Sequence, residues 1–127
     1  MEEHNPNIVK YLIDAYVIIN HINKKSDLLT KFKGKHLCMS VLTIFELYLG
    51  AESQKDIALL DDLLRYFEKI DVNYNVSQKA AGMGRHGNLS NIGVVDLILA
   101  ATSIEYKLVL VTGNKKHFKM IAGIEIY

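Results

Sequence analysis

The sequence has little cysteine, since Cys38 is its single cysteine among 127 residues. One thiol cannot form an intrachain disulfide, and no group of cysteine and histidine residues has the local spacing of a zinc site. We therefore expect a protein that folds in the reducing cytoplasm without disulfides or a structural metal. Cys38 lies in an apolar run, which predicts an inert position in the core.

Long hydrophobic runs are also missing. No apolar stretch reaches the roughly 20 residues that a membrane-spanning helix needs. The first ten residues, MEEHNPNIVK, are polar and acidic, whereas a secretion signal has a basic segment followed by an apolar one. Both features argue against secretion and against membrane insertion.

Proline and low-complexity sequence are scarce as well. Pro6 is the one proline and lies outside the predicted core, and no long-period repeat or biased segment interrupts the chain. The sequence therefore has no sign of an internal domain boundary. We predict an N-terminal extension over residues 1–10 and a single domain over residues 11–127.

Neither sign of charge is in large excess. The 15 basic and 14 acidic residues give a net charge of +1, which does not indicate a general nucleic-acid binder. The lysines are nonetheless clustered in two regions, and each cluster is either a solvated face or a surface that contacts phosphates. The clusters are Lys24, Lys25, Lys31, Lys33 and Lys35, and Lys115, Lys116 and Lys119.

Half of the residues are hydrophobic, which is enough to form a core in a chain of this length. Short apolar runs at residues 11–13, 36–39 and 108–111 have the length of buried strands. The first of these leads directly into a helical pattern. A brief strand is also predicted over residues 70–72, and an edge strand over residues 124–127.

Helical spacing of apolar residues fills most of the intervals. It predicts helices over residues 42–49 and 56–69, another capped by Ser77, and a buried helix that starts from Asp96. The glycine-rich residues 82–93 are the most loop-like segment. Strands that alternate with helices predict an α/β fold with a mostly parallel sheet covered on both sides. Ligands of such sheets bind at the carboxyl ends of the strands.

Three acidic residues occupy positions where apolar or neutral residues are expected. Asp14 follows the first buried strand, Glu46 lies inside an apolar helix, and Asp96 has apolar neighbours. Buried carboxylates without partners are costly, and the only two arginines are distant in sequence. A divalent cation would relieve the repulsion, and Mg²⁺ and Mn²⁺ prefer carboxylate and water ligands. The three acids are therefore a candidate metal site.

Each acid also has a simpler explanation. Asp96 can act as a helix N-cap, where a carboxylate accepts hydrogen bonds from free N–H groups. Asp14 can be an ordinary turn residue at the end of a strand. Glu46 is harder to explain in this way, because its apolar neighbours and Thr43, three residues earlier, suggest that it faces a polar pocket.

The order of these motifs resembles the PIN domain family, and within it the VapC-type ribonuclease toxins of toxin-antitoxin pairs. The resemblance extends over nearly the whole chain after residue 10 and depends on four motifs. These are Tyr11 to Asp14 with Val17 to Ile19; Ser40, Thr43, Glu46, Leu47 and Gly50; Ile92, Gly93, Asp96, Ile98 and Ala100 to Thr102; and Leu110 to Asn114 with His117, Phe118 and Gly123.

The resemblance implies a three-layer fold and a Mg²⁺- or Mn²⁺-dependent endoribonuclease that hydrolyses RNA phosphodiester bonds. It also implies an antitoxin partner and a homodimer, for which residues 17–32 and 56–69 offer amphipathic surfaces. The implied catalytic residues are Asp14, Glu46, Asp96 and Asn114, of which the three acids hold the metal. Supporting roles are implied for Ser40, Thr43 and Thr112.

Some positions depart from the family pattern. Ala15 and Tyr16 replace the threonine and asparagine that follow the first acid in many relatives, and Asn114 replaces a fourth acid. An amide oxygen adds no charge, which weakens the expectation of a second bound ion. His117 stands where aspartate is frequent, and we interpret it as a residue that steadies its loop.

Two other classes of function compete with the nuclease. A PIN module without catalytic activity would act in RNA binding or protein interaction, and Ala15 and Asn114 favour this alternative. A phosphotransfer domain would use the aspartate after the first strand as its nucleophile, but it needs a second acid where Tyr16 stands. Nucleotide binding is less well supported, because no glycine-rich loop follows the first strand.

Overall fold

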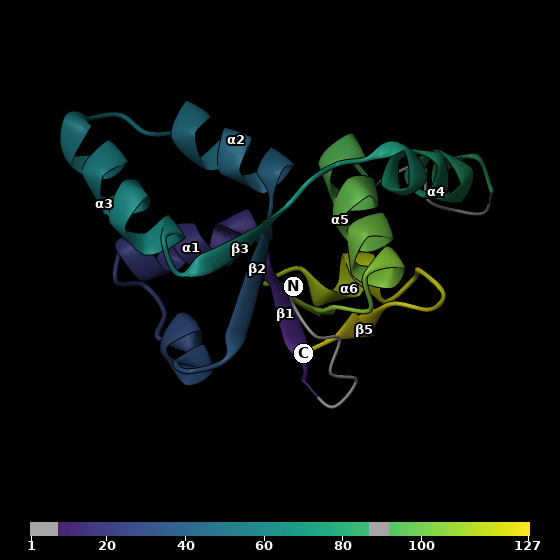
Figure 1. The fold of residues 1–127 in the computed structure, drawn as a ribbon, viewed down its shortest axis with the longest axis horizontal. Helices are drawn as coiled ribbons and strands as arrows, with labels where there is room; N and C mark the ends of the chain where they lie inside the picture. The colour runs from purple at the N-terminus through teal and green to yellow at the C-terminus, as the bar shows by residue number, and fades with distance from the viewer. Residues whose placement is uncertain (1–7, 87–91) are drawn as a thin grey trace, which may run out of the picture.

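A five-stranded sheet forms the centre of the molecule in the computed structural model, which describes residues 8–86 and 92–127 (Figure 1). All of its neighbouring strands pair in parallel, in the order β3-β2-β1-β4-β5. The predicted α/β fold is thus confirmed, and the sheet is wholly parallel. The strands are β1 (Lys10–Ile13), β2 (His36–Ser40), β3 (Phe67–Ile70), β4 (Val109–Val111) and β5 (Glu125–Ile126).

Helices cover both faces of the sheet and make a three-layer structure. Figure 1 shows the sheet between two groups of helices. One group comprises α1 (Ala15–Ile22), the 3₁₀ helix η1 (Leu28–Phe32), α2 (Val41–Leu49) and α3 (Gln54–Leu64). The other comprises α4 (Tyr74–Arg85), α5 (Val94–Glu105) and α6 (Lys115–Phe118).

Alternating strand residues divide the hydrophobic core between the two faces. Ile13 and Met39 pack with buried residues of α1, α2 and α3, whereas Leu12, Cys38 and Leu110 pack with those of α5 and α6. Successive side chains of a strand point to opposite faces, so apolar runs without alternation are what two covered faces require. Cys38 lies in the core, as predicted.

The order of the strands reverses beside β1. The chain adds β2 and β3 on one side of β1, and then crosses over to place β4 on the other side. In open parallel sheets, such a reversal leaves a crevice at the carboxyl ends of the two strands, because the following segments diverge to opposite faces. The hydrogen bond from Asp14 N–H to the Val111 carbonyl, 3.0 Å long, joins β1 and β4 at this edge.

The predicted helix over residues 56–69 is too long, and the predicted strand over residues 70–72 is too late. The helix α3 ends at Leu64, and β3 occupies Phe67–Ile70. Phe67 fits the helical stripe by spacing alone, but pairing with Leu37 of β2 gives it a strand partner. Phe67 and Ile70 pack on opposite faces of the sheet, which a strand allows and a one-sided helix does not.

The boundaries of α4 and α5 also differ from the prediction. The N-cap of α4 is Asn73, whose side chain accepts from Val76 N–H, and Ser77 lies within the helix. Part of the predicted loop over residues 82–93 is helical, since α4 continues to Arg85, while residues 87–91 lie outside the described residues. The helix α5 begins at Val94, two residues before the predicted start.

The strand β1 begins one residue before residue 11, the predicted start of the domain. Lys10 pairs with His36 in the sheet, so β1 includes the last residue of the predicted extension.

In the described ranges, none of the helices has both the length and the apolar character needed to cross a bilayer.

Candidate active site

A cleft of about 310 Å³ lies at the carboxyl ends of β1 and β4, where the strand order reverses. All four residues predicted to be catalytic line it: Asp14, Glu46, Asp96 and Asn114. They are far apart in the sequence and come from the segments that follow β1 and β4 and from the helices α2 and α5. The fold therefore brings them to one place.

Asp14 lies at the junction of β1 and α1 and is 9% exposed. It occupies the N-cap position of α1, but its side chain makes no capping hydrogen bond. One carboxylate oxygen, Oδ2, instead accepts a 2.7 Å hydrogen bond from the hydroxyl of Thr112, which follows β4. The ordinary role of a turn residue does not account for this orientation toward the neighbouring strand.

Glu46 is a half-buried residue in the middle of α2. The helix begins where β2 ends, because Ser40 closes the strand and its hydroxyl accepts a hydrogen bond from Leu42 N–H at 3.2 Å. Glu46 is then carried to the cleft one turn and a half into the helix. Its lining position agrees with the interpretation that it faces a polar pocket.

Asp96 lies in the first turn of α5 and is not its N-cap, because Gly93 holds that position. The capping explanation for Asp96 is therefore wrong. A carboxylate in the first helical turn still gains from the free N–H groups and the helix dipole. Asp96 Oδ2 also lies 3.4 Å from Nδ1 of His117, on α6.

Burial and neighbouring negative charge raise the proton affinity of Glu46 and Asp96. Burial raises the pKa of Glu46 above its usual value, and the negative charges of Asp14 and Asp96 raise it further. Burial and the charge of Asp14 also raise the pKa of Asp96, while His117 opposes this effect in part. Carboxylates whose charged forms are disfavoured in this way retain strong affinity for another positive charge.

The polar residues that follow β4 form a chain of hydrogen bonds beside the cleft. The Thr112 hydroxyl donates to Asp14 and accepts a 3.0 Å hydrogen bond from Asn114 N–H. The side-chain nitrogen of Asn114 lies 2.9 Å from Nδ1 of His117. His117 therefore contacts both Asn114 and Asp96. It was predicted to steady its own loop, and it also contacts one of the three acids.

Two other predicted supporting residues lie in α2 and at its start. Ser40 is fully buried and caps the helix, so its hydroxyl is already engaged with the backbone. Thr43 is also fully buried, and within the described residues its hydroxyl has no hydrogen-bond partner. A buried hydroxyl without a partner is costly, so Thr43 retains capacity for a further hydrogen bond.

The set of donors in the cleft matches a hard divalent cation. Three carboxylates and one amide face a common space, and oxygen ligands of this kind suit Mg²⁺ and Mn²⁺. For the described part of the chain, the ligand oxygens of Asp14, Glu46 and Asp96 do not all lie within 4.8 Å of one another.

A known protein family matches this chain. The profile of the PIN domain family matches residues 11–124, which is most of the chain. The chain belongs to the PIN domain family. This confirms the family resemblance identified from the four sequence motifs.

Individual relatives of this PIN domain are similar over almost their whole length. Ribonuclease VapC2 of Haemophilus influenzae is 29% identical, with 92% of this chain and 96% of the relative covered. The tRNA(fMet)-specific endonuclease VapC of Salmonella typhimurium is 27% identical, with 94% and 97% covered.

A solved structure has the same fold. One chain of VapBC2 from Rickettsia felis superimposes on this chain with a TM-score of 0.81. That structure was solved with VapBC2 bound to a DNA fragment from its promoter. The VapBC2 chain is 24% identical, with 94% of this PIN domain and 98% of that chain covered. At this identity the likeness shows a common fold.

Sequence reasoning missed the walls of the cleft. Tyr16, Ile19 and Val95 line it together with the acids, so an exposed aromatic ring and two aliphatic side chains border the charged centre. Tyr16 and Ile19 are three residues apart on α1, so helical spacing after Asp14 places them on the same face of the helix. That signal was available in the sequence.

Proposed function

We propose that this PIN domain is a Mg²⁺- or Mn²⁺-dependent endoribonuclease and the toxin of a toxin-antitoxin pair. One observation carries the proposal: Asp14, Glu46 and Asp96 line a single cleft at the point where the strand order reverses. The names of the relatives, ribonuclease VapC2 and a tRNA-specific endonuclease, support RNA as the substrate.

Asp14, Glu46 and Asp96 would hold the metal. A bound divalent cation would lower the pKa of a water molecule and neutralise charge on the scissile phosphate. Thr112 fixes the orientation of Asp14 through its 2.7 Å hydrogen bond. Partners of this kind set the direction of metal ligands in other proteins.

Asn114 would act at the side of the cleft as a neutral donor and acceptor. Its backbone N–H is held by Thr112 and its side chain lies beside His117, so the amide is positioned before any ligand arrives. We assign it to orienting the phosphate or a water molecule. Thr43, with its available hydroxyl, and Ser40, which positions α2, would support Glu46.

The experiment is cleavage of a mixed RNA pool, including initiator tRNA, by the purified chain with Mg²⁺ or Mn²⁺. We expect cleavage that EDTA abolishes and that Asp96→Asn reduces by more than about 10–100-fold, the loss that follows when only a hydrogen-bond partner of a metal ligand is removed. Asp62→Asn is the matched control, because it removes a 73% exposed carboxylate on α3. Equal activity of Asp96→Asn and wild type would contradict the proposal.

The second candidate is a catalytically quiet PIN module that binds RNA or protein. Asn114 favours it, because an amide at the fourth acidic position lowers the negative charge available for a second ion. Binding of Mn²⁺ and RNA by the wild type without cleavage, at every metal concentration tested, would support this alternative.

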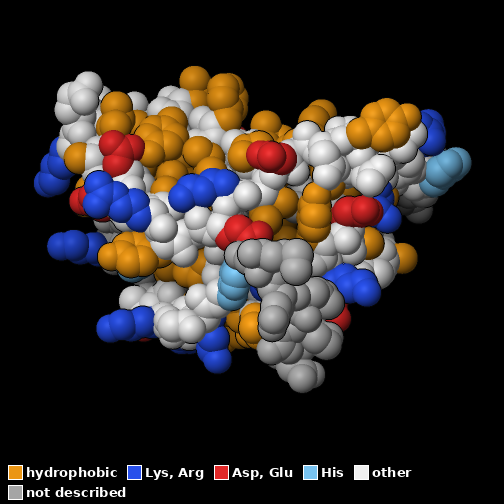
Figure 2. All heavy atoms as spheres, in the orientation of Figure 1, with side chains coloured by type: hydrophobic (Ala, Val, Ile, Leu, Met, Phe, Trp, Pro, Cys, Tyr) orange, Lys and Arg blue, Asp and Glu red, His pale blue; other side chains and the backbone are white. Residues whose placement is uncertain are grey.

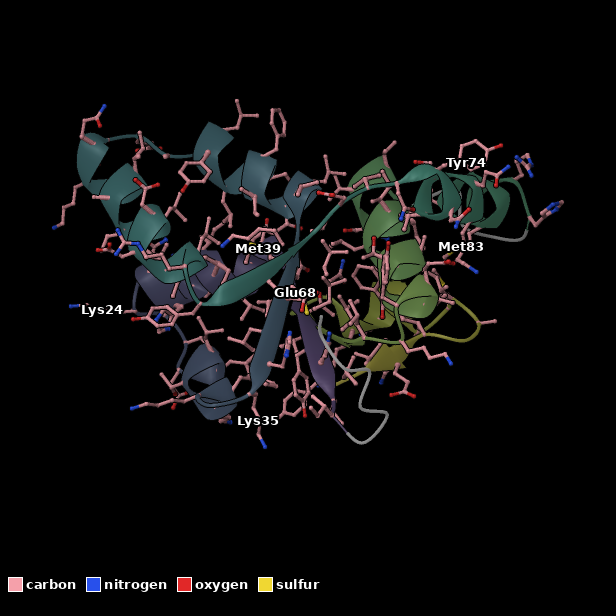
Figure 3. The ribbon with its side chains drawn as sticks, in the orientation of Figure 1. Lys24, Lys35, Met39, Glu68, Tyr74 and Met83 are labelled. Carbon is pink, nitrogen blue, oxygen red and sulfur yellow. The ribbon has the colours of Figure 1, made fainter. Side chains whose placement is uncertain are left out.

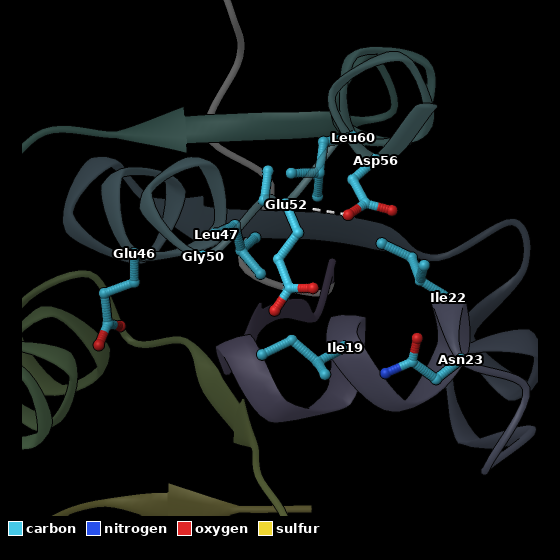
Figure 4. Close-up of a pocket in the computed structure, with 10 residues that line it drawn as sticks. Ile19, Ile22, Asn23, Glu46, Leu47, Gly50, Glu52, Asp56 and Leu60 are labelled. Carbon is cyan, nitrogen blue, oxygen red and sulfur yellow. Dashed lines mark hydrogen bonds between the residues drawn. The ribbon is translucent and has the colours of Figure 1, made fainter. Parts of the chain in front are cut away.

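An antitoxin partner is proposed for the groove between α1, α2 and α3, which has a volume of about 330 Å³. Its floor is apolar and includes Ile22 and Leu60, and Figure 4 shows Glu52 and Asp56 beside them. Glu46 and Ile19 line both this groove and the acidic cleft. A partner segment with an apolar face and a basic side chain would therefore reach the acids.

A homodimer and a cytoplasmic location are proposed as well. Figure 2 shows hydrophobic side chains gathered at the upper edge of the molecule, over α2. Phe45 and Leu49, one helical turn apart on this helix, are 60% and 73% exposed, and contiguous exposed apolar surface of this kind marks interaction sites. The one cysteine agrees with a reducing compartment.

A further inference from the structure

A second group of potential metal ligands lies on the sheet, and none of its residues lines the acidic cleft. His36 and Cys38 belong to β2, and Glu68 belongs to β3. The ligand atoms of these three side chains all lie within 4.8 Å of one another. His36 Nε2 and Glu68 Oε1 are 2.6 Å apart. Figure 3 shows Glu68 over the middle strands of the sheet.

The backbone of the sheet brings the three residues together. His36 and Cys38 are two residues apart on one strand, so their side chains point to the same face. Cys38 pairs directly with Glu68 in the register of β2 and β3. The local sequence has no zinc-type spacing because the third residue comes from the neighbouring strand, 30 residues after Cys38.

This cluster is separate from the candidate active site. His36 begins β2 and Ser40 ends it, so the two ends of this strand are roughly 13 Å apart at 3.3 Å per residue. The acidic cleft lies at the carboxyl ends of β1 and β4, whereas the cluster occupies the first and middle residues of β2 and the second residue of β3 and contributes nothing to the lining of the cleft. A metal held by the cluster would therefore not be one of the ions used at Asp14, Glu46 and Asp96.

The cluster combines a buried sulfur with two ligands that solvent can reach. Cys38 is fully buried, whereas the side chains of His36 and Glu68 are 33% and 34% exposed. Burial tends to raise the pKa of Glu68, but its hydrogen bond with His36 and the nearby charge of Lys10 outweigh this and lower it. The carboxylate is thus ready to bind a cation, and Lys10, 3.4 Å away, is its present cationic partner.

We propose that His36, Cys38 and Glu68 bind a zinc-class cation. Imidazole, thiolate and carboxylate are its usual ligands, and a water molecule would complete the tetrahedron. Thiolate disfavours Mg²⁺ and Mn²⁺, which prefer oxygen. With bonds of about 2.0–2.3 Å, tetrahedral ligand atoms lie roughly 3.3–3.8 Å apart. The 2.6 Å contact between His36 and Glu68 would therefore open by about 0.7 Å on metal binding, and Lys10 would give up its place beside Glu68.

The bound cation would tie β2 to β3 and release the proton of the Cys38 thiol. Because an unfolded chain does not hold the three ligands together, binding favours the folded state. The site does not depend on the proposed nuclease, and its test does not measure cleavage.

The test uses Co²⁺ as a spectroscopic substitute for Zn²⁺ on the full chain under reducing conditions. Cobalt bound to thiolate gives a charge-transfer band in the near ultraviolet, and Cys38 is the one cysteine that can produce it. We expect the band to saturate at one cobalt per chain and to disappear when Zn²⁺ is added. No band, or saturation at one cobalt per two chains, would overturn the proposal.

Variants separate this site from incidental binding through the cysteine alone. His36→Gln should weaken binding by more than about tenfold, while His21→Gln, on α1, should leave it unchanged. Lys10→Gln should tighten binding, because the lysine competes with the metal for Glu68. These side chains are partly exposed, so the test stands even if Cys38→Ala does not fold. If neither His36→Gln nor Lys10→Gln changed the cobalt affinity measured from the band, the assignment of this site would be wrong.

Discussion

The hydroxyl of Thr112 connects the ends of two strands. It donates to Asp14, after β1, and accepts from Asn114 N–H in the turn after β4. Thr112 is 2% exposed, so water does not replace these bonds if the hydroxyl is lost. A single oxygen atom thus positions two of the residues proposed for catalysis.

The first prediction concerns Thr112→Val, which keeps the shape of the side chain and removes this oxygen. Loss of a hydrogen bond to a buried carboxylate should lower the free energy of unfolding by about 1–3 kcal/mol. Cleavage should fall by about 10–100-fold, as when partners of metal ligands are removed. Urea denaturation and the RNA assay measure the two effects.

Thr102→Val is the matched control for this substitution. Thr102 is buried in α5, and its hydroxyl donates to the Ile98 carbonyl of the same helix, away from the acids. The control should alter stability without changing cleavage by folded protein. If Thr112→Val retained full cleavage, the proposed role of Thr112 in orienting Asp14 would be wrong.

At the scale of the elements, α4 depends on a cap that helical periodicity did not reveal. Asn73 accepts a 2.9 Å hydrogen bond from Val76 N–H, and its side-chain nitrogen donates to the Tyr106 hydroxyl at 2.6 Å. Ser77, the predicted cap, instead donates its hydroxyl to the Asn73 carbonyl from within the helix. The residue that starts α4 therefore also joins it to the end of α5.

The second prediction follows from this difference. Asn73→Ala should lower the free energy of unfolding by about 1–2 kcal/mol, the usual cost of losing a cap. Ser77→Ala should cost less than about 0.5 kcal/mol, because an exposed hydroxyl within a helix contributes little. Thermal or urea denaturation of the two variants side by side measures the difference. Equal losses would mean that the hydrogen bond at Asn73 does not stabilise the helix.

The elements that the sequence predicted well are those whose burial is continuous. The strands β1, β2 and β4 are apolar on both faces, which only a covered parallel sheet accommodates. The junction of α3 and β3 was predicted wrongly, because Phe67 continues a helical stripe and belongs to a strand only through its pairing with β2. Pairing over such a distance leaves no local pattern in the sequence.

The candidate site shows the same division. Asp14, Glu46 and Asp96 could be identified because each acid interrupts an apolar pattern, and the carboxyl ends of parallel strands converge. The contact of His117 with Asp96 could not be predicted, since it depends on how α6 packs against α5. The second cluster, formed by His36, Cys38 and Glu68, depends on the register of β2 and β3. That register could not be predicted from the sequence.

At the scale of the molecule, charge is distributed unevenly along the strands. The acidic cleft lies at their carboxyl ends, while Lys33 and Lys35 directly precede β2, at the opposite edge. Figure 3 shows Lys24 and Lys35 at the left and lower margins, away from α2 and α5. Lys116 and Lys119, in and after α6, instead follow Asn114, which lines the cleft. The net charge of +1 conceals this separation.

The third prediction is that the two lysine clusters differ in RNA binding. Replacing Lys116 and Lys119 by glutamine should weaken binding by about tenfold and reduce its dependence on salt, because phosphate contacts release counterions. The same change at Lys33 and Lys35 is the control and should have little effect. Binding of RNA to an inactive Asp96→Asn background, measured at several salt concentrations, separates the two. Equal losses would place the RNA path on both edges.

The last prediction concerns the effect of Glu46→Gln on the free energy of unfolding. This effect should change sign when metal is added and vanish at low pH. Repulsion and burial raise the pKa of Glu46 above its ordinary value of 4.5. The folded chain then binds more protons than the unfolded chain as pH rises above that value, so this carboxylate lowers stability at neutral pH. In EDTA at pH 7, Glu46→Gln should raise the free energy of unfolding by up to about 1 kcal/mol, after screening by solvent.

The gain from Glu46→Gln should vanish below about pH 4, where the wild-type side chain is protonated in both states. Saturating Mg²⁺ should reverse its sign at pH 7, because the wild type gains stability from binding that the variant lacks. Glu52→Gln, which removes a carboxylate outside the cleft, should show neither effect. Urea denaturation at both pH values, with EDTA and with Mg²⁺, measures all four conditions. A Glu46→Gln variant stabilised equally with and without Mg²⁺ would show that Glu46 does not hold the metal.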